Sequence, residues 1–448
     1  MSAGVCCSIS AEPTQSASGR RRVRSPIVPA VGGDHAAIAC FLGDVFGETA
    51  RSEFNASIDD PFYEPRDRLL LRRAGRIIAH VHLTHRIMHF GSVRIPVAGL
   101  GGLATSPQCR GQGLGTHLLA AAEKQMIQSG ALVGLLRCRI PYFFRRTGWA
   151  LWGPHNSGRT GAHAVLSRLL DEGLRPGRRR RLHVRPWRRW EEAGLMRIYN
   201  QNVGGSYGLL ERTRPYWRWL LQRRAFDQLY VALDGPNLWD LDETSTQLVG
   251  YAAIKGGRIL ELMTAPGRWK AAVELLARIC GDAIEQDRHT IILHAPPGSP
   301  LLGIFDPAGG RQHDPASDCG EVHMARLLDP VGLLRHLCGE FSRRAEAAGL
   351  ARPLELGLLV DGRKYQIELG TQAVRAVENH LGRSYLRLNV ADFTRLVLGQ
   401  LDWDRACSEG RLAPSTVLAS EAGRALFPMM PLWRPPLDDL MTDRIAGE

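Results

Sequence analysis

The sequence has no uninterrupted run of about 18 to 20 apolar residues, the length that a membrane-spanning helix needs. It also lacks the pattern of a cleavable leader, because the apolar segment 27–31 after Arg20–Arg22 is short and is broken by Pro29. Residues 1–24 have the composition of a disordered tail. We therefore expect a cytoplasmic protein with no membrane partner.

Cysteine occurs nine times but never at the spacing of a metal site or of a disulfide framework. The cysteines are Cys6, Cys7, Cys40, Cys109, Cys138, Cys280, Cys319, Cys338 and Cys407. An odd and unpatterned set is typical of a reducing compartment, so we expect neither structural disulfides nor a bound metal.

Lysine is scarce, since only four of the 57 basic residues are lysines and arginine is spread along the whole chain. The net charge of +12 is compatible with a nucleic-acid partner, but the even spread of arginine favours codon bias over a docking surface. The run Arg178–Arg181, followed by Trp187 and Trp190, is either a basic aromatic patch or a solvated linker. We favour the linker and expect no nucleic-acid partner.

A chain of 448 residues exceeds what one hydrophobic core organises, so it should fold as roughly two to four domains. The basic stretch 175–189 and the Pro/Gly-rich stretch 296–310 are typical of domain boundaries. We place a first domain at 25–158, a second domain at 159–320 that opens with the basic linker, and a third domain at 321–448.

The first domain alternates helical and strand patterns. Helical character over 36–54 is followed by strand patterns at 69–71, 77–83 and 93–104, by a helical pattern at 114–127 and by a buried strand at 132–136. A hairpin turn is expected at Ala74–Gly75. This order predicts a mixed α/β sheet.

The third domain shows alternating apolar positions, which predict half-buried strands. They lie at 354–360, 365–369 and 386–390, and the first two are joined near Asp361–Gly362. Together with a helical start after Glu321, these strands predict a small α+β domain.

The most informative stretch is a glycine-rich turn between a strand and a helix, Arg110–Gly115. Its three glycines leave backbone N–H groups unobstructed at a helix N-terminus, where the partial positive charge suits a diphosphate. Arg110 can add a charge-assisted contact. A dinucleotide fold is the competing interpretation, but it requires an acidic residue some 20 positions on, and the next strand ends in Arg137–Cys138.

Two motifs in this order resemble those of the GNAT acetyltransferases. Gln108-Cys-Arg-Gly-Gln-Gly-Leu-Gly115 is similar to their (Q/R)xxGx(G/A) acetyl-CoA motif, and Phe143-Phe-Arg-Arg-Thr-Gly-Trp149 is similar to their FYxxxGF segment. The resemblance extends to the Eis (enhanced intracellular survival) branch. The residues that carry this extension are 97–105, Asn200, Gly208, Arg212, Tyr216-Trp217, 249–251 and 324–329.

The resemblance implies two tandem GNAT folds with mixed α/β sheets, the second without the pyrophosphate turn, and a C-terminal α+β domain like sterol carrier protein. It also implies acetyl-CoA as co-substrate, no metal, and a homo-oligomer that is a hexamer. The cofactor-binding residues that it implies are Leu103, Ala104, Thr105, Arg110, Gly111, Gln112, Gly113, Leu114, Gly115 and Thr116. Backbone groups of Leu103 and Thr105 would hold the pantetheine arm.

The resemblance implies two proton-handling groups, and this chain departs from the pattern at both. Phe144 replaces the tyrosine that usually protonates the thiolate, and Tyr142, the candidate substitute, would point about 160° away on a helix. The branch uses its C-terminal carboxylate as a base, whereas this chain continues past the matching end at Leu440 to Glu448. Transfer survives loss of the acid in principle, because a thiol with a pKa of about 8.5 is a tolerable leaving group.

Two further polar groups have alternative interpretations. Four histidines lie on one strand and suit either a metal or structural and substrate-facing roles; we favour the latter, with His82 or His85 as a candidate proton relay. They are His80, His82, His85 and His89. An acidic stretch either attracts a cationic amine or caps loops, and we favour the caps. It comprises Asp59, Asp60, Glu64 and Asp67.

We therefore expect an acetyl-CoA-dependent N-acetyltransferase that transfers an acetyl group by direct attack of a primary amine, either a small cationic amine or a lysine. The alternative is a catalytically weakened protein of the same fold that binds CoA or a hydrophobic ligand. A nucleic-acid-binding scaffold is a third and weaker option.

Overall fold

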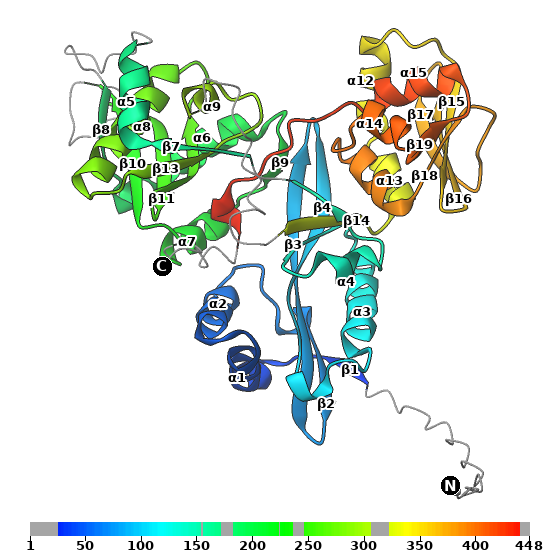
Figure 1. Ribbon diagram of the computed structural model, residues 1–448, viewed down its shortest axis with the longest axis horizontal. Coiled ribbons are helices and arrows are strands. Elements are labelled where there is room, and N and C mark those ends of the chain that lie inside the picture. Colours follow the sequence, from blue (N-terminus) through cyan, green and yellow to red (C-terminus); the bar gives the residue numbers. More distant parts are fainter. Residues whose placement is uncertain are drawn as a thin grey trace, which may run out of the picture.

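The computed structural model describes residues 26–153, 156–171, 182–223, 225–235, 246–305 and 322–439. The tail at 1–24, the run Arg178–Arg181 and Glu448 lie outside the described residues. Three sheets carry the architecture, and Figure 1 shows them in three lobes of the molecule. Within the described ranges, no helix combines the length and the apolar character that crossing a bilayer demands.

The first sheet is mixed, with the strand order β1-β2-β3-β4-β5-β14-β6 and with β9 paired to β3. Its elements up to residue 151 are β1 (Ile27–Pro29), α1 (His35–Phe46), α2 (Glu48–Ile58), β2 (Arg68–Arg73), β3 (Arg76–Phe90), β4 (Val93–Thr105), α3 (Leu114–Gln128), β5 (Val133–Cys138), α4 (Pro141–Arg145) and β6 (Ala150–Leu151). The expected hairpin is confirmed, because β2 and β3 pair in antiparallel fashion around Ala74–Gly75.

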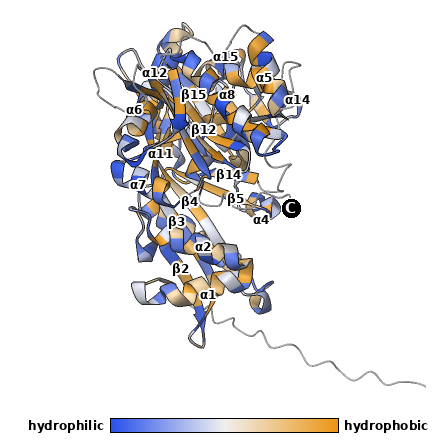
Figure 2. Ribbon diagram, turned by 90° about the vertical axis from the view of Figure 1, so that its left-hand side faces the viewer, coloured by the Kyte–Doolittle hydropathy of each residue, from blue (hydrophilic) through white to orange (hydrophobic). Residues whose placement is uncertain are grey.

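The helical character expected over 36–54 takes the form of two helices. Gly47 separates α1 from α2 and has φ +92°, a backbone conformation that breaks a helix and that glycine adopts without strain. Each helix buries one side only, and Figure 2 shows both hydrophobic and hydrophilic residues on them. The break lets the pair bend over the sheet.

Helices cover both faces of the first sheet. Successive side chains of a strand point to opposite faces, so each strand contacts helices on both sides. On one face, α3 packs Leu118 and Met126 against Val81 of β3. On the other face, α1 and α2 pack against residues such as Leu70 of β2 and Ala104 of β4. The face under α1 and α2 therefore carries the alternate set of side chains from β2 and β3.

Strands from distant parts of the chain complete this sheet. β14 (Val322–Leu327), which the sequence assigns to the third domain, lies between β5 and β6. β9 (Tyr207–Leu210) comes from the second domain and pairs with β3. Arg326 of β14 donates to the Glu123 carboxylate and to the Thr147 carbonyl, both at 2.6 Å. The first sheet is thus closed by residues far beyond position 158.

The second sheet has the order β7-β13-β12-β11-β10-β8. Its elements are β7 (Ser157–Gly161), α5 (Ala162–Asp171), β8 (Leu182–Pro186), α6 (Glu192–Val203), α7 (Arg214–Gln222), β10 (Gln228–Asp234), β11 (Gln247–Lys255), β12 (Arg258–Thr264), α8 (Trp269–Glu285), β13 (Thr290–His294) and α9 (Pro300–Phe305). As in the first sheet, four antiparallel strands are followed by a crossover helix and a parallel strand, here β12, α8 and β13. This repeated topology supports two tandem copies of one fold.

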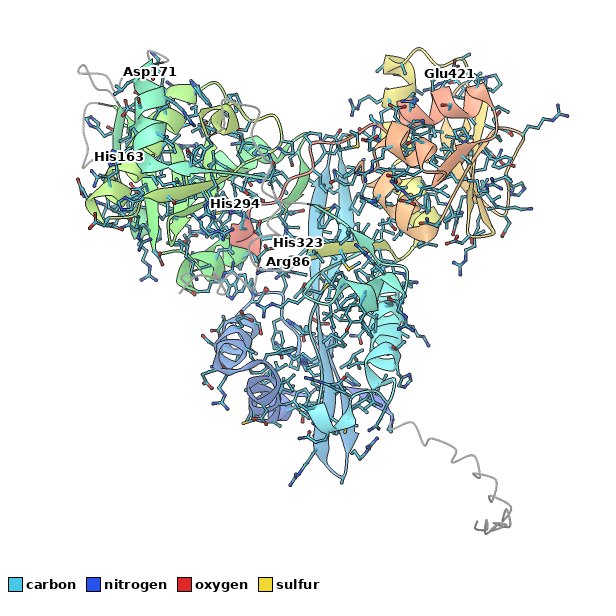
Figure 3. All side chains as sticks on the ribbon, in the orientation of Figure 1. Arg86, His163, Asp171, His294, His323 and Glu421 are labelled. Atoms are coloured by element: carbon cyan, nitrogen blue, oxygen red, sulfur yellow. The ribbon has the colours of Figure 1, made fainter. Side chains whose placement is uncertain are left out.

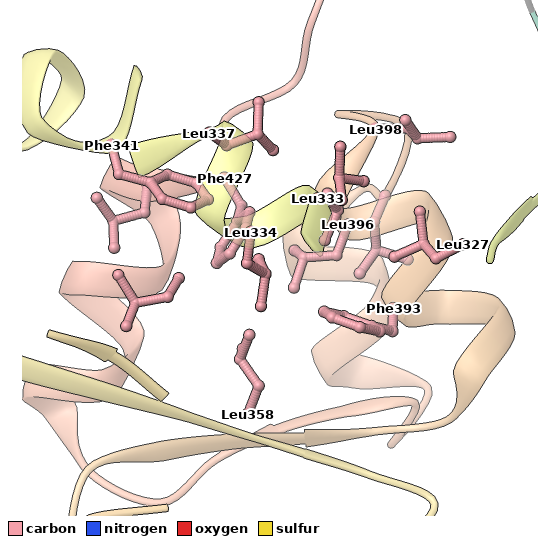
Figure 4. Packing of buried hydrophobic residues seen from close by; sticks show 14 of the residues in the cluster. Leu327, Leu333, Leu334, Leu337, Phe341, Leu358, Phe393, Leu396, Leu398 and Phe427 are labelled. Carbon is pink, nitrogen blue, oxygen red and sulfur yellow. The ribbon is translucent and has the colours of Figure 1, made fainter. Parts of the chain in front are cut away.

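The third sheet has the order β17-β16-β15-β18-β19 and is covered by helices. The elements are α11 (Pro330–His336), α12 (Cys338–Ala347), β15 (Leu354–Val360), β16 (Arg363–Leu369), β17 (Val374–Glu378), β18 (Tyr385–Leu388), α13 (Val390–Val397), α14 (Trp403–Ser408), β19 (Leu412–Pro414) and α15 (Val417–Leu426). Figure 4 shows its core, where Phe341, Phe393 and Phe427 lie near Leu358 of the sheet. The expected α+β character of this segment is confirmed.

We predict that residues 25–158 alone aggregate, because removal of β14 leaves β5 and β6 with unpaired edges. The same segment carrying residues 322–327 on a flexible linker should elute as a soluble species in size-exclusion chromatography. A soluble, folded segment without β14 would contradict this prediction.

Candidate functional site

The glycine-rich turn before α3 is open to solvent. Gly111 and Gly113 have φ +74° and +77°, and a Cβ built on either meets no heavy atom within 4 Å. The first bond into the helix runs from the His117 N–H to the Gly113 carbonyl at 3.0 Å. By helix geometry, the amides of residues 114–116 therefore have no intrahelical acceptor. The turn presents a set of N–H donors at the positive end of a helix.

Polar side chains flank this turn. Arg110 is exposed, and its Nε donates to the Thr105 carbonyl at 3.4 Å. Arg73 of β2 donates to the Gln112 side chain at 3.2 Å. Ala104 is buried toward α1, so only its backbone can face a ligand. The expected cofactor residues thus surround one surface at the end of β4.

The two parallel strands β4 and β5 separate next to this turn. Their pairing joins 97–100 to 133–136, and within the described residues no pairing between them extends further, although β4 continues to Thr105. A bulge in β4 marks the place, because the register with β3 shifts between His80 and His82 and Gly102 has φ +57°. The separation leaves backbone groups of β4 available to a ligand.

A buried histidine holds the bulge. Arg68 Nη1 lies 3.1 Å from His80 Nε2, and arginine has no acceptor, so Nε2 must be unprotonated. The proton therefore sits on Nδ1, which donates to the Gly102 carbonyl at 2.8 Å. Burial, and then the nearby charge of Arg68, lowers the pKa of His80 to about 3. The ring is neutral at every pH near 7 and fixes the carbonyl at the point where the strands part.

A cavity of about 190 Å³ opens beside the bulge, on the face covered by α1 and α2. It is smaller than the ~300 Å³ at which pockets for drug-sized ligands begin. Its apolar wall comes from both helices, from β4 and β5, and from β9. The residues of this wall are Leu42, Phe46, Phe54, Leu100, Leu136 and Leu210.

Its polar wall is drawn from three parts of the chain. The first domain supplies Arg68, His82 and Arg86, the second domain supplies Tyr216, and the C-terminal segment 433–439 supplies Arg434, Asp438 and Asp439. Arg86 forms an ion pair with Asp60, and Arg434 with Asp439 at 2.8 Å. His323 of β14 lies 3.7 Å from Asp439, and Figure 3 shows His323 and Arg86 close to this junction.

A buried ion network holds the C-terminal segment at the cavity. Arg212 is fully buried and donates to Glu261 at 2.9 and 2.6 Å and to Asp438 at 3.0 and 2.8 Å. The Tyr216 hydroxyl donates to Asp438 at 3.3 Å. Burial raises the pKa of Tyr216 to about 12, so this hydroxyl keeps its proton at neutral pH.

The structure does not bring the candidate acid to this cavity. Tyr142 is 67% exposed and is not among the cavity-lining residues, whereas Phe144 is buried against Phe143 and Trp149. The aromatic ring at 144 therefore belongs to the core. Glu448, the candidate base, lies outside the described residues.

Of the two histidines predicted as proton relays, one lines the cavity and the other lies outside it. His82 lines the cavity, and burial together with the charge of Arg68 lowers its pKa well below the usual value. His85 lies 3.4 Å from Asp67 and does not line the cavity. Within the described ranges, no group of three His, Cys, Asp or Glu side chains is placed to hold a metal.

Sequence reasoning missed the parts of the site that come from distant elements. For Arg68 the sequence holds one local indication of a special role, because a charged residue stands directly before the apolar run of β2. Tyr216 was noticed only through the resemblance, and Asp438 and Asp439 gave no local signal, because tertiary packing brings all three to the cavity.

We predict that the free energy of unfolding falls less steeply with falling pH in His80→Asn than in the unmodified chain. Because the pKa of His80 falls from 6.5 to about 3 on folding, the unfolded chain binds more protons below pH 6.5, and stability is lost as the pH falls. The loss should reach about 2.5 kcal/mol at pH 4.5, at roughly 1.4 kcal/mol per pKa unit. Urea unfolding of both proteins between pH 7.5 and 4.5 measures it, and equal slopes would contradict the assignment.

We predict that Asp438→Ala lowers the free energy of unfolding by about 1 to 3 kcal/mol, because Arg212 keeps Glu261 as a partner but loses its hydrogen bonds to Asp438. The C-terminal segment should then become sensitive to proteolysis. Asp404→Asn is the control, since the side chain of Asp404 is 81% exposed and its ion pair with Arg424 should be dispensable. Equal protection of the segment in both variants would contradict the role of this network.

Comparisons with known proteins agree with this geometry. Residues 29–152 match the acetyltransferase (GNAT) domain family. No curated protein matches the sequence. Among solved structures, a GCN5-related N-acetyltransferase from Kribbella flavida is similar, with 16% identity, a TM-score of 0.68, and coverage of 92% of this chain and 97% of its own.

Two further structures share the fold over nearly the same length. A GCN5-related N-acetyltransferase from Anabaena variabilis has 15% identity and a TM-score of 0.68, with 91% of this chain and 98% of its own covered. Eis1 from Mycobacterium abscessus has 16% identity and a TM-score of 0.58, with 91% and 99% covered. Residues 29–152 thus form an acetyltransferase domain of the GNAT type, which supports the prediction of an acyltransferase.

Proposed function

We propose that the chain is an acetyl-CoA-dependent N-acetyltransferase that acetylates a primary amine bound in the cavity under α1 and α2. The observation that carries the proposal is the position of the open turn at 110–116, next to the place where β4 and β5 separate. The amides of residues 114–116, which have no intrahelical acceptor, suit the diphosphate of acetyl-CoA, and Arg110 adds a positive charge. The freed backbone of Leu103 and Thr105 suits the amides of the pantetheine arm.

In the proposed reaction, the lone pair of a neutral amine attacks the thioester carbonyl. A C–N bond forms, the C–S bond breaks, the amine loses a proton and the thiolate of CoA gains one. The carboxylates that line the cavity are Glu53, Asp438 and Asp439. Asp438 is held by Arg212 and Asp439 by Arg434, so Glu53 is the better acceptor for the amine proton. The thiolate takes its proton from water, as its low basicity allows.

A weakened protein of the same fold that binds CoA or a hydrophobic ligand is the second candidate. Its support is the replacement of the usual acid by Phe144, which is 4% exposed. The sterol-carrier-like nature of the third domain and assembly into a hexamer also remain proposals. The first is consistent with a five-stranded sheet covered by helices, and the second rests on resemblance alone.

We predict that Gly113→Ala raises the dissociation constant for acetyl-CoA at least tenfold in calorimetry, because a Cβ would stand among the donor amides. Gly75→Ala is the matched control. Both glycines have similar φ, +77° and +78°, and open space around them, so the backbone strain is equal while only Gly113 faces the ligand. Equal affinities of the two variants would contradict the cofactor site. If acetyl-CoA binds but no amine in a broad panel releases free CoA, the second candidate replaces the first.

A further inference from the structure

Arg68 is a buried cation that lines the cavity without a carboxylate partner. Its residue exposure is 2%, and among the described residues it makes no ion pair. Asp67, the neighbouring acid, lies 3.4 Å from His85 and attracts Arg68 only at longer range, without an ion pair. Isolated buried charges are costly, so an arginine in this position is typical of a site whose counter-ion arrives with a ligand.

The hydrogen bonds that Arg68 does make all go to neutral groups. Nε donates to the Tyr63 hydroxyl at 3.2 Å, Nη2 to the Ser57 hydroxyl at 2.6 Å, and Nη1 to the neutral ring of His80. The guanidinium also lies 4.5 Å from the centre of the Phe54 ring, which offsets part of the cost of burial. These contacts orient the group but do not neutralise it.

Within the described ranges, three of the five guanidinium donors are engaged, which leaves one N–H on each terminal nitrogen for a ligand. Such a pair binds a carboxylate through two parallel hydrogen bonds. The network around Arg68 is therefore a preorganised anion site that faces the cavity.

The register of the sheet places this anion site close to the proposed reaction centre. Arg68 of β2 pairs with His82 of β3, and His82 pairs with Gly101 of β4. The three residues form one row across the sheet, so the Cα atoms of Arg68 and Gly101 are about 10 Å apart, two strand spacings. Pairing of β4 with β5 ends at Leu100, beside Gly101. A carboxylate held by Arg68 would thus lie within a few bonds of an amine at the thioester.

We propose that the acceptor is an amino acid or a close relative, with a carboxylate bound by Arg68, an apolar side chain and a primary amine that receives the acetyl group. This inference rests on the proposed acetyltransferase function and names its substrate class. The cavity volume of about 190 Å³ suits such a small molecule, and Leu42, Phe54 and Leu136 form its apolar wall. Of the carboxylates that line the cavity, Asp438 and Asp439 already form ion pairs with Arg212 and Arg434, so Arg68 is the cation that a substrate carboxylate would meet.

The test compares amines that differ only in the carboxylate. The release of free CoA from acetyl-CoA by the full-length chain is measured with two matched pairs of acceptors. L-phenylalanine is compared with phenethylamine, and L-leucine with isoamylamine, at equal concentrations of neutral amine. The amino acids should have a kcat/KM roughly tenfold to a hundredfold higher, the value of hydrogen bonds to a charged group. Arg68→Met should bring each pair to within about threefold of equality, and Arg68→Lys should retain part of the preference.

Arg72→Met is the control, because Arg72 lies on the same strand but is already paired with Asp34. It should keep the preference of the unmodified chain. Turnover of both members of each pair at equal rates by the unmodified chain would overturn the inference and leave the acetyltransferase proposal standing. That comparison needs no variant, so it decides the matter even if Arg68→Met fails to fold. Absence of acetyl-CoA binding would overturn both proposals together.

Discussion

A neutral imidazole between a guanidinium and a backbone carbonyl is the contact on which the site depends. His80 accepts from Arg68 on one side and donates to Gly102 on the other, so it couples the buried cation to the bulge in β4. The arrangement works only while the ring is uncharged, and burial next to Arg68 ensures this by lowering its pKa. One side chain thus orients the proposed carboxylate site and fixes the strand that would hold the cofactor.

The cavity is assembled from all three parts of the chain. The first domain provides strands of the sheet and the helices α1 and α2, the second provides Tyr216, and the C-terminal segment 433–439 provides Asp438 and Asp439. Figure 1 shows this last segment crossing from the third lobe back to the second. The network around Arg212 holds it there, and its charges are buried but mutually satisfied. A shared network of this kind couples the integrity of the cavity to the packing of the second domain.

The two related sheets differ at the point that matters for the cofactor. In the first, a turn with left-handed glycines at 111 and 113 leads into α3. In the second, the short connection from Thr264 to Trp269 holds a single glycine with a positive φ, Gly267, so the start of α8 lacks the pair of glycines that precedes α3. The same topology can therefore carry a diphosphate site in one copy and serve as scaffold in the other.

The sequence alone determined the local features of this protein. The apolar runs of β2 and β3, the alternation in β15 and β16, the hairpins at 74–75 and 361–362 and the turn before α3 were all predicted, because they depend on residues close together in the chain. Tertiary structure decided the rest. The insertion of β14 beside β5, the return of Asp438 to Arg212 and the burial of Arg68 depend on partners distant in sequence, which no local pattern encodes. Strand pairing and ion pairing over such separations are chosen by the packing of whole sheets, and for this reason the cavity became visible only in the folded chain.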